Sequence, residues 1–267
     1  MSPRPSIKTV GILGFGAFGR LIAAHLDPHV SLVACDPALM PGKRYQGRVR
    51  IGDTADVGRC DVVILAVPVG ELSTAIAELR PHLRPGSTVV DVGSVKVRPI
   101  EVMKALLPAD VEIVGTHPLF GPQSARHGIA GRKIAVCPVR GRSALRIAAF
   151  LRAALGLDVY LVSAEEHDRQ AAIVQGVTHL IARVLVRMEP LPTELTTASF
   201  DHLMQATEMV RYDAASVYLA IERDNPYAAE IRGRFFMLAE RTRAELDQHG
   251  SAGATSASPN FTLTDRK

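Results

Sequence analysis

Residues 9–19 read Thr-Val-Gly-Ile-Leu-Gly-Phe-Gly-Ala-Phe-Gly, and this stretch decides the fold. Its first five residues have the composition of a short buried strand, and the helical run 20–26 follows the last glycine. A second apolar run, 31–35, ends at Asp36. The fingerprint of a dinucleotide-binding βαβ unit consists of a strand, G-x-G-x-x-G, a helix, a second strand and an acid, in this order. The sequence therefore predicts an α/β fold that begins with such a unit.

Each glycine of the fingerprint has its own expected role. We expect Gly14 to make the tight turn, Gly16 to let the backbone approach a pyrophosphate, and Gly19 to let helix and strand pack closely. The helix N-terminus offers free N–H groups and a positive dipole end to the phosphates. The predicted cofactor-binding residues lie on this stretch and at later strand ends: Gly14, Phe15, Gly16, Ala17, Phe18, Gly19, Asp36, Val67, Pro68 and Ser94.

Asp36 bears on the choice of dinucleotide. A carboxylate at this position can accept both ribose hydroxyls of NAD and repels the 2′-phosphate of NADP. Lys43 and Arg44 lie a little downstream and could offset that repulsion if their loop folds back, or they could be solvated loop charges. We therefore predict NAD as the cofactor, with NADP possible.

Strand and helix patterns continue to alternate as far as residue 162. The further apolar runs typical of buried strands are 61–68, 88–92, 111–114, 133–137 and 158–162. This alternation predicts a mainly parallel, doubly wound Rossmann-type sheet, and so a dinucleotide-binding domain over residues 1–163.

From residue 164 helical spacing replaces the strand signal. The expected helices are 164–188, 199–209, 214–223 and 227–248. We predict an all-helical substrate domain over 164–249. It is small, so we expect it to complete its core against a second copy of the chain and form a homodimer. The Ser-, Ala-, Gly- and Thr-rich residues 250–267 are predicted to be a disordered tail.

The composition argues against several classes of function. The 31 basic residues are scattered among 27 acids without a basic block, so no nucleic-acid partner is expected. Cys35, Cys60 and Cys137 are widely spaced, so we expect buried free thiols and no metal site. No signal peptide is recognised and no apolar run is long enough to span a membrane, so we expect a soluble, cytoplasmic protein.

A second informative stretch is Gly115-Thr116-His117-Pro118-Leu119-Phe120-Gly121-Pro122, directly after the apolar run 111–114. Its glycines and prolines predict a tight loop at a strand end, which is where ligands bind in open α/β sheets. An isolated histidine is more often structural, yet this position makes His117 a candidate for catalysis. Residues 93–96 and 163–168 are expected to meet it at a cofactor cleft between the domains.

These segments give the chain a resemblance to the prephenate and arogenate dehydrogenases of tyrosine biosynthesis. The matching motifs are residues 91–96 (Asp-Val-Gly-Ser-Val-Lys), 115–122, 166–168 (Glu-His-Asp) and 175–179 (Gln-Gly-Val-Thr-His). With the fingerprint, the resemblance covers about residues 7–248, and residues 200–227 look closer to the plant arogenate enzymes.

The resemblance implies NAD(P)-dependent oxidative decarboxylation of a cyclohexadienol. Hydride passes from the hydroxyl-bearing carbon to the nicotinamide, the hydroxyl loses its proton, and the ring carboxylate leaves as carbon dioxide. The family pattern makes His117 the general base, and Ser94 the group that hydrogen-bonds the hydroxyl and aligns His117. The implied substrate-binding residues are His167, Asp168, Gln175 and His179. The structural alternatives are a helix cap for Ser94, a first helical turn for 167–168, and helix packing for the last two.

Asp168 also bears on the substrate. Arogenate carries an ammonium where prephenate has a keto group, and a buried ammonium needs an anionic partner. In the plant enzymes that the chain resembles, an acid at this position accompanies arogenate use. Some bacterial members place an arginine for the ring carboxylate where this chain has Gln205; Arg126, Arg169 and Arg211 are possible substitutes. We therefore expect arogenate to be preferred and prephenate to be the slower substrate.

Two other classes of function are alternatives for this chain. A reductase of the β-hydroxyacid dehydrogenase or imine reductase kind shares this architecture, but hydroxyacid members use a lysine in the long helix after the sheet. This chain has no lysine between Lys133 and Lys267. A non-catalytic NAD-binding protein would have lost the catalytic positions, whereas His117 and Ser94 are both present.

Overall fold

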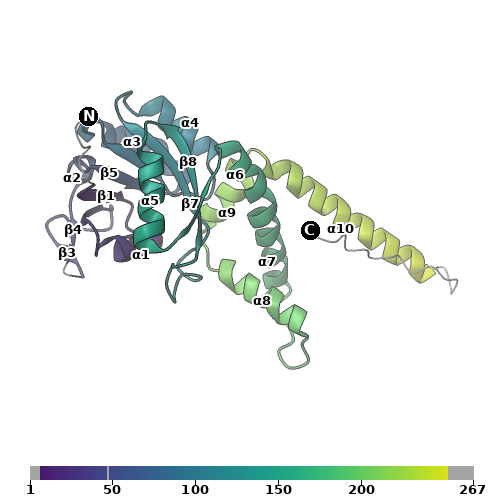
Figure 1. Ribbon diagram of the computed structural model, residues 1–267. Coiled ribbons are helices and arrows are strands. Elements are labelled where there is room, and N and C mark those ends of the chain that lie inside the picture. Colours follow the sequence, from purple (N-terminus) through teal and green to yellow (C-terminus); the bar gives the residue numbers. More distant parts are fainter. Residues whose placement is uncertain (1–6, 47, 252–267) are drawn as a thin grey trace.

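The computed structural model describes residues 7–46 and 48–251. Within these residues nine strands form one sheet in the order β3-β4-β2-β1-β5-β6-β7-β8-β9 (Figure 1). The strands are β1 (Thr9–Leu13), β2 (Ser31–Cys35), β3 (Arg44–Tyr45), β4 (Val49–Ile51), β5 (Val62–Leu65), β6 (Thr88–Asp91), β7 (Glu112–Pro118), β8 (Lys133–Arg140) and β9 (Asp158–Leu161).

The central strands run parallel, as the alternating pattern predicts. The pairs β2–β1, β1–β5, β5–β6 and β6–β7 are all parallel. Two antiparallel pairs, β3–β4 and β7–β8, were not predicted. A two-residue strand such as β3 is too short to carry a periodic signal, and the direction of β8 depends on its long connection from β7. The predicted α/β doubly wound fold is confirmed.

Helices cover both faces of the sheet. They are α1 (Ala17–Leu26), α2 (Thr54–Gly58), α3 (Leu72–Leu79), α4 (Val97–Leu106) and α5 (Ser143–Leu155), with the short turns η1 (Val69–Glu71) and η2 (Arg80–His82) beside α3. One apolar core joins α1 and α5 to the sheet, and a second joins α2, α3 and α4 to its other face. The strand order and these two layers bring the β1–α1, β5–α3 and β6–α4 connections to one edge of the sheet.

After β9 the chain is helical throughout the described residues. The elements are α6 (Ala164–Ala171), η3 (Ala172–Val177), α7 (Thr178–Arg187), α8 (Ala198–Val210), α9 (Ala215–Leu219), η4 (Ala220–Asp224) and α10 (Ala228–Ser251). The segments η3 and η4 are π-helical, which the sequence did not predict. Residues 250 and 251 were expected in the tail but belong to α10, and the rest of that predicted tail lies outside the described residues.

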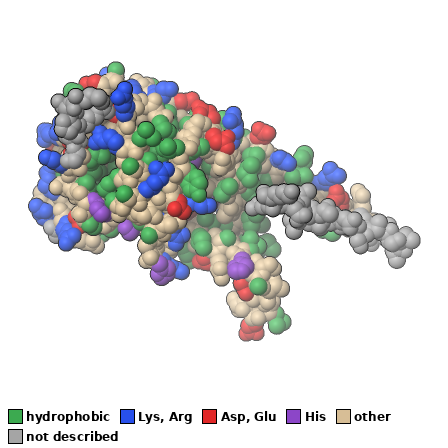
Figure 2. Space-filling view, viewed as in Figure 1, with side chains coloured by type: hydrophobic (Ala, Val, Ile, Leu, Met, Phe, Trp, Pro, Cys, Tyr) green, Lys and Arg blue, Asp and Glu red, His purple; other side chains and the backbone are tan. Residues whose placement is uncertain are grey.

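The helical part exposes many apolar side chains. They include Ile173, Val174, Val184, Leu203, Met209, Phe236, Met237, Leu238 and Leu246. The helix α10 projects from the rest of the chain, and apolar side chains are visible at the surface of the helical part (Figures 1 and 2). None of the helices in the described part of the chain has the length and apolar character needed to cross a membrane.

Candidate active site

The glycine-rich turn joins β1 to α1 at the carboxyl edge of the sheet. Gly14 has φ +94°, and a Cβ there would lie 2.5 Å from the carbonyl oxygen of Ala66, so the position requires glycine. A Cβ on Gly19 would overlap the carbonyl oxygen of Gly14. By contrast, a Cβ on Gly16 would meet nothing within 4 Å. Open space therefore adjoins the backbone where α1 presents its unpaired N–H groups, which fits a pyrophosphate.

Asp36 lies directly against this turn. Its carboxylate accepts a hydrogen bond from the backbone N–H of Phe15 at 2.7 Å. The Phe15 side chain is buried and packs edge-on against the ring of Tyr45 at 5.1 Å, so its contribution to a ligand site would come from its backbone. Tyr45 belongs to β3, so the loop after Asp36 does fold back toward the turn. The guanidinium of Arg44, however, bonds a carbonyl of its own hairpin.

The other predicted cofactor residues surround the turn. Ala17 and Phe18 open α1, the first exposed and the second half-buried. The side chain of Val67 would lie 3.1 Å from a Cβ on Gly14, and Pro68 precedes η1. Ser94 is half-buried between β6 and α4. Its alternative role as the cap of α4 is not observed, because a different residue accepts the N–H groups at that helix end.

A buried ion pair connects β6 to β7 just before His117. Lys96 is 0% exposed, and its ammonium donates to the carboxylate of Asp91 and to the carbonyl oxygen of Thr116. The Thr116 hydroxyl in turn donates to the carbonyl oxygen of Asp91 at 2.7 Å. Burial raises the pKa of Asp91, while the Lys96 ammonium opposes that shift. These contacts fix the strand end that carries His117.

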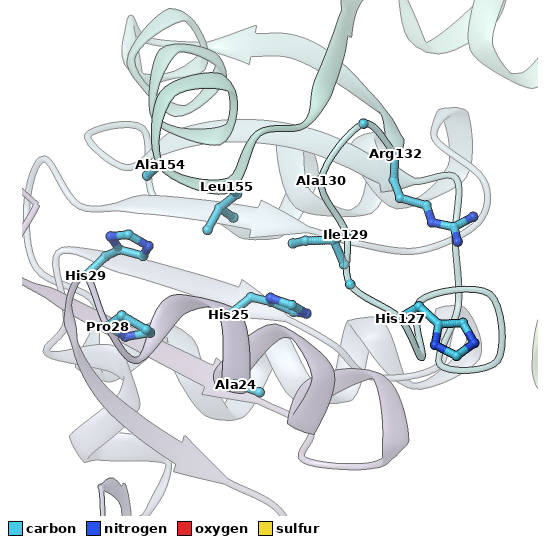
Figure 3. Close-up of a pocket in the computed structure, with 12 residues that line it drawn as sticks. Ala24, His25, Pro28, His29, His127, Ile129, Ala130, Arg132, Ala154 and Leu155 are labelled. Carbon is cyan, nitrogen blue, oxygen red and sulfur yellow. The ribbon is translucent and has the colours of Figure 1, made fainter.

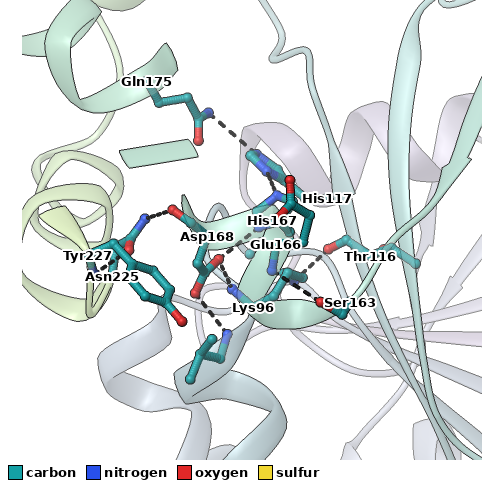
Figure 4. Close-up of polar contacts among 12 residues, drawn as sticks. Lys96, Thr116, His117, Ser163, Glu166, His167, Asp168, Gln175, Asn225 and Tyr227 are labelled. Carbon is teal, nitrogen blue, oxygen red and sulfur yellow. Dashed lines mark hydrogen bonds and ion pairs between the residues drawn. The ribbon is translucent and has the colours of Figure 1, made fainter. Parts of the chain in front are cut away.

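His117 is 4% exposed and takes part in a series of polar contacts (Figure 4). Its Nδ1 lies 2.9 Å from Nε2 of His167, and Nδ1 of His167 lies 2.7 Å from Oδ1 of Asp168. The amide nitrogen of Gln175 lies 3.5 Å from Nε2 of His117. Burial, followed by the nearby His167 and Lys96, holds the pKa of His117 well below its ordinary value of 6.5. The imidazole is therefore neutral, and able to accept a proton, at neutral pH.

The structure corrects the expected surroundings of Asp168. We predicted that it would face a cleft and meet a substrate ammonium. Instead it is 0% exposed, and its two oxygens accept the backbone N–H groups of Lys96 at 2.8 Å and Val97 at 2.9 Å. Asp168 thus caps α4 from a different helix while also holding His167. It presents no exposed carboxylate to a ligand, so the substrate preference cannot rest on it.

Of the two predicted residues further along, Gln175 lies beside His117 and His179 does not. His179 is buried on α7, where its Nε2 lies 3.6 Å from a carboxylate oxygen of Asp213 and its ring lies near that of Tyr218. Burial lowers the pKa of His179. In this structure its partners are residues of the helical part, which agrees with the packing alternative.

Asn225 was missed by sequence reasoning. Its side chain is buried and donates to the backbone carbonyl of Asp168 at 2.8 Å, which ties the start of α10 to α6. Asn225 and Pro226 lie in the gap between the expected helices 214–223 and 227–248. A buried asparagine before a proline needs hydrogen-bond partners, and that is the signal that could have identified it.

The possible partners of a ring carboxylate are spread out. Gln205 is exposed on α8. Arg211 is paired with Glu189 and Glu208, and Arg169 stacks on the ring of Tyr227 at 4.9 Å. Arg126 is exposed in the loop after β7 and bonds His127.

A separate pocket of about 570 Å³ lies at the C-terminal ends of α1 and α5 (Figure 3). His25, His29, His127 and Arg132 are among its lining residues. None of the predicted site residues lines this pocket. Among the described residues no group of three or more His, Cys, Asp or Glu side chains could hold a metal ion.

Comparison with known proteins gives consistent matches. The family model described as "Prephenate dehydrogenase, nucleotide-binding domain" matches residues 47–162. Arogenate dehydrogenase 1, chloroplastic, of Arabidopsis thaliana is 30% identical over 271 residues, covering 95% of this chain and 42% of that protein. Arogenate dehydrogenase 2, chloroplastic, of the same plant is 29% identical, covering 91% of this chain and 71% of that protein. This chain thus spans less than half the length of the first of these relatives.

A solved structure has the same fold. Prephenate dehydrogenase from A. aeolicus, in complex with hydroxyphenyl propionate and NAD+, superposes with a TM-score of 0.72 at 20% sequence identity. The superposition covers 93% of this chain and 94% of that chain, so the likeness extends over the sheet and the helices after it.

Proposed function

The chain belongs to the family of prephenate and arogenate dehydrogenases, and from this premise we propose that it catalyses NAD(P)-dependent oxidative decarboxylation, with arogenate preferred over prephenate. The observation that carries the proposal is His117: a buried, neutral imidazole at a strand end, on the edge of the sheet where the glycine-rich turn lies. The two predicted domains, 1–163 and 164–249, would serve cofactor binding and substrate binding, respectively.

In this proposal a bound nicotinamide dinucleotide supplies the hydride acceptor. The N-terminus of α1 and the open space at Gly16 would hold its pyrophosphate, and Asp36, beside the same turn, would accept the ribose hydroxyls. His117 accepts the proton of the substrate hydroxyl at Nε2, and Ser94 hydrogen-bonds the same hydroxyl. Loss of that proton allows hydride to leave the ring carbon, and loss of carbon dioxide completes an aromatic ring.

The preference for arogenate is supported by the two plant relatives, both named arogenate dehydrogenases, and by Gln205 at the position where some bacterial members have an arginine. The test is to incubate the purified protein with each substrate and each dinucleotide and to follow the absorbance of the reduced nicotinamide. We expect a larger kcat/KM for arogenate. Absence of reduction with both substrates would contradict the proposed function, and a larger kcat/KM for prephenate would contradict only the preference.

The first prediction concerns the dinucleotide. Asp36→Ala is expected to weaken NAD binding by about 10- to 100-fold, since a hydrogen bond to a charged group contributes about 1.5–3 kcal/mol. The advantage of NAD over NADP should narrow at the same time, because the repulsion of the 2′-phosphate is lost. Dissociation constants measured for both cofactors check this. Arg44→Ala is the comparison variant. A strong preference of the wild-type protein for NADP would overturn the NAD assignment.

The second prediction is a homodimer formed through the helical part, because its exposed apolar side chains need a partner. Light scattering at micromolar concentration should give twice the 28.7 kDa of one chain. Met237→Glu on α10 should shift the mass toward one chain, while Leu145→Glu, similarly exposed but on α5, should leave it unchanged. A wild-type monomer at this concentration is the result that would count against the dimer.

A further inference from the structure

The residues Asp168, His167 and His117 form a buried relay whose donors and acceptors can be assigned in sequence. Asp168 is 0% exposed, and the N–H groups of Lys96 and Val97 both point at its carboxylate, which acts as an acceptor. The ring nitrogen of His167 at 2.7 Å from Oδ1 therefore has to donate. This fixes the proton of His167 on Nδ1.

The assignment of His117 follows from that of His167. A neutral His167 with its proton on Nδ1 has a lone pair on Nε2, which lies 2.9 Å from Nδ1 of His117. His117 then donates through Nδ1 and keeps the lone pair on Nε2. Among the described residues the hydrogen-bond partner of that second nitrogen is the amide nitrogen of Gln175, at 3.5 Å, a distance at the limit of a hydrogen bond.

We propose that His167 and Asp168 are positioning residues that hold His117 in the tautomer with a free Nε2, and do not bind the substrate. This inference rests on the proposed function, in which Nε2 takes the proton of the substrate hydroxyl. The O–H bond breaks, the new N–H bond forms on His117, and the oxygen electron pair becomes the carbonyl bond as hydride leaves the ring carbon. The Asp168 carboxylate stabilises the resulting imidazolium through His167, as a buried acid does for a catalytic histidine in other enzymes.

The charged groups around the relay determine in which direction the pKa of His117 is shifted. Lys96 faces His117 from the start of α4 and disfavours an imidazolium, while Asp91 beside Lys96 partly offsets it. On β8, burial raises the pKa of Cys137 to about 12, so that thiol stays neutral. Glu165, on α6, adds a further negative charge near Cys137. Asp168 is thus the carboxylate connected to the histidine pair, and its removal should lower the pKa of His117.

Two substitutions of His167 separate positioning from a general loss of structure. His167→Gln can accept from His117 and donate to Asp168, so it preserves the order of donors and acceptors without a titrating ring. His167→Leu has a similar size but removes both contacts. We expect about a 10²-fold or larger fall in kcat for the leucine variant and less than about a 10-fold fall for the glutamine variant, with KM nearly unchanged in both. Equal losses in the two variants, or a change mainly in KM, would overturn the inference.

The pH profile of kcat/KM is a measurement that a purely structural role of Asp168 would not shift. Neutral His117 is the active form, so kcat/KM falls as pH falls through its pKa. Asp168→Asn removes the negative charge, so the acid limb should move to lower pH while the plateau falls. Ser163→Ala is the matched control: it removes the cap of α6, where the Ser163 hydroxyl accepts from Glu166 N–H at 3.1 Å, without touching the relay. Ser163→Ala should leave the acid limb of the pH profile in place. An acid limb that does not move in Asp168→Asn would contradict the relay.

A measurement without turnover keeps this inference distinct from the proposed function. Nitrogen NMR of the imidazoles in the cofactor-free protein reports which ring nitrogen carries the proton. We expect His117 to be protonated on Nδ1 in the wild type and in His167→Gln, and to populate both tautomers in His167→Leu. Protonation of wild-type His117 on Nε2 would overturn the relay even if the enzyme oxidises arogenate. The expected tautomer in a protein without activity would instead leave the relay in place and remove the proposed reaction.

Discussion

Replacing His117 by alanine is expected to reduce turnover by about 10²- to 10⁴-fold, the typical contribution of a general base. Binding of the dinucleotide should be nearly unchanged, because the hydrogen bonds of Asp36 at the glycine-rich turn are separate from those of His117. The measurement is single-turnover and steady-state kinetics together with the dissociation constant of the cofactor. A variant with wild-type turnover would make His117 a packing residue.

The exposed His127 provides the comparison for this experiment. It lies in the loop after β7, and His127→Ala should retain wild-type kinetics.

The wild type should also lose kcat/KM on acidification only below about pH 6.5, because burial lowers the pKa of His117 and its neutral form is the base. An acid limb above that pH would show that a different group controls the reaction.

Lys96→Met is expected to cost about 3–5 kcal/mol of unfolding free energy, because it leaves the buried Asp91 carboxylate without its partner. Lys96 is 0% exposed and also holds the carbonyl of Thr116, next to His117. Urea unfolding measures the loss. Lys104→Met, on the exposed side of α4, should change the free energy by less than about 0.5 kcal/mol.

The pH dependence gives the Lys96 prediction a definite sign. Burial already raises the pKa of Asp91, and loss of the ammonium raises it further. A carboxyl whose pKa is higher in the folded than in the unfolded protein stabilises the folded state at low pH. This stabilisation is lost as the pH rises through the pKa of the folded state. The destabilisation by Lys96→Met should therefore be smaller at acid pH, and Asp91→Asn in the same chain should recover part of it. A loss independent of pH and of Asp91 would refute the ion-pair explanation.

The dinucleotide fingerprint could be predicted from sequence because its requirements are local. Gly14 needs its positive φ and Gly19 its close approach, and both are consequences of the turn itself. The spacing of apolar residues likewise predicted the alternation of strands and helices. The strand β3 could not be predicted because two residues are too few to show a period. The π-helical turns could not be predicted because their apolar residues keep nearly α-helical spacing.

The role of Asp168 could not be predicted because it depends on distant contacts. Its partners Lys96 and Val97 are more than seventy positions away in sequence, so no local pattern marks them. The motif was enough to single out His167 and Asp168, and it placed them near His117. It did not say which of them would be enclosed, and the substrate contact expected of Asp168 assumed an open carboxylate that the fold does not provide.

Asp168 also links three segments that lie far apart in the sequence. Its carboxylate fastens α6 to the first turn of α4, while Asn225 fastens the start of α10 to the backbone of Asp168, and Arg98 pairs with Asp224. We expect these three anchors to hold α6 and the segment before α10 close to α4 and the sheet. Bending of the helical part would then leave the geometry around His117 unchanged.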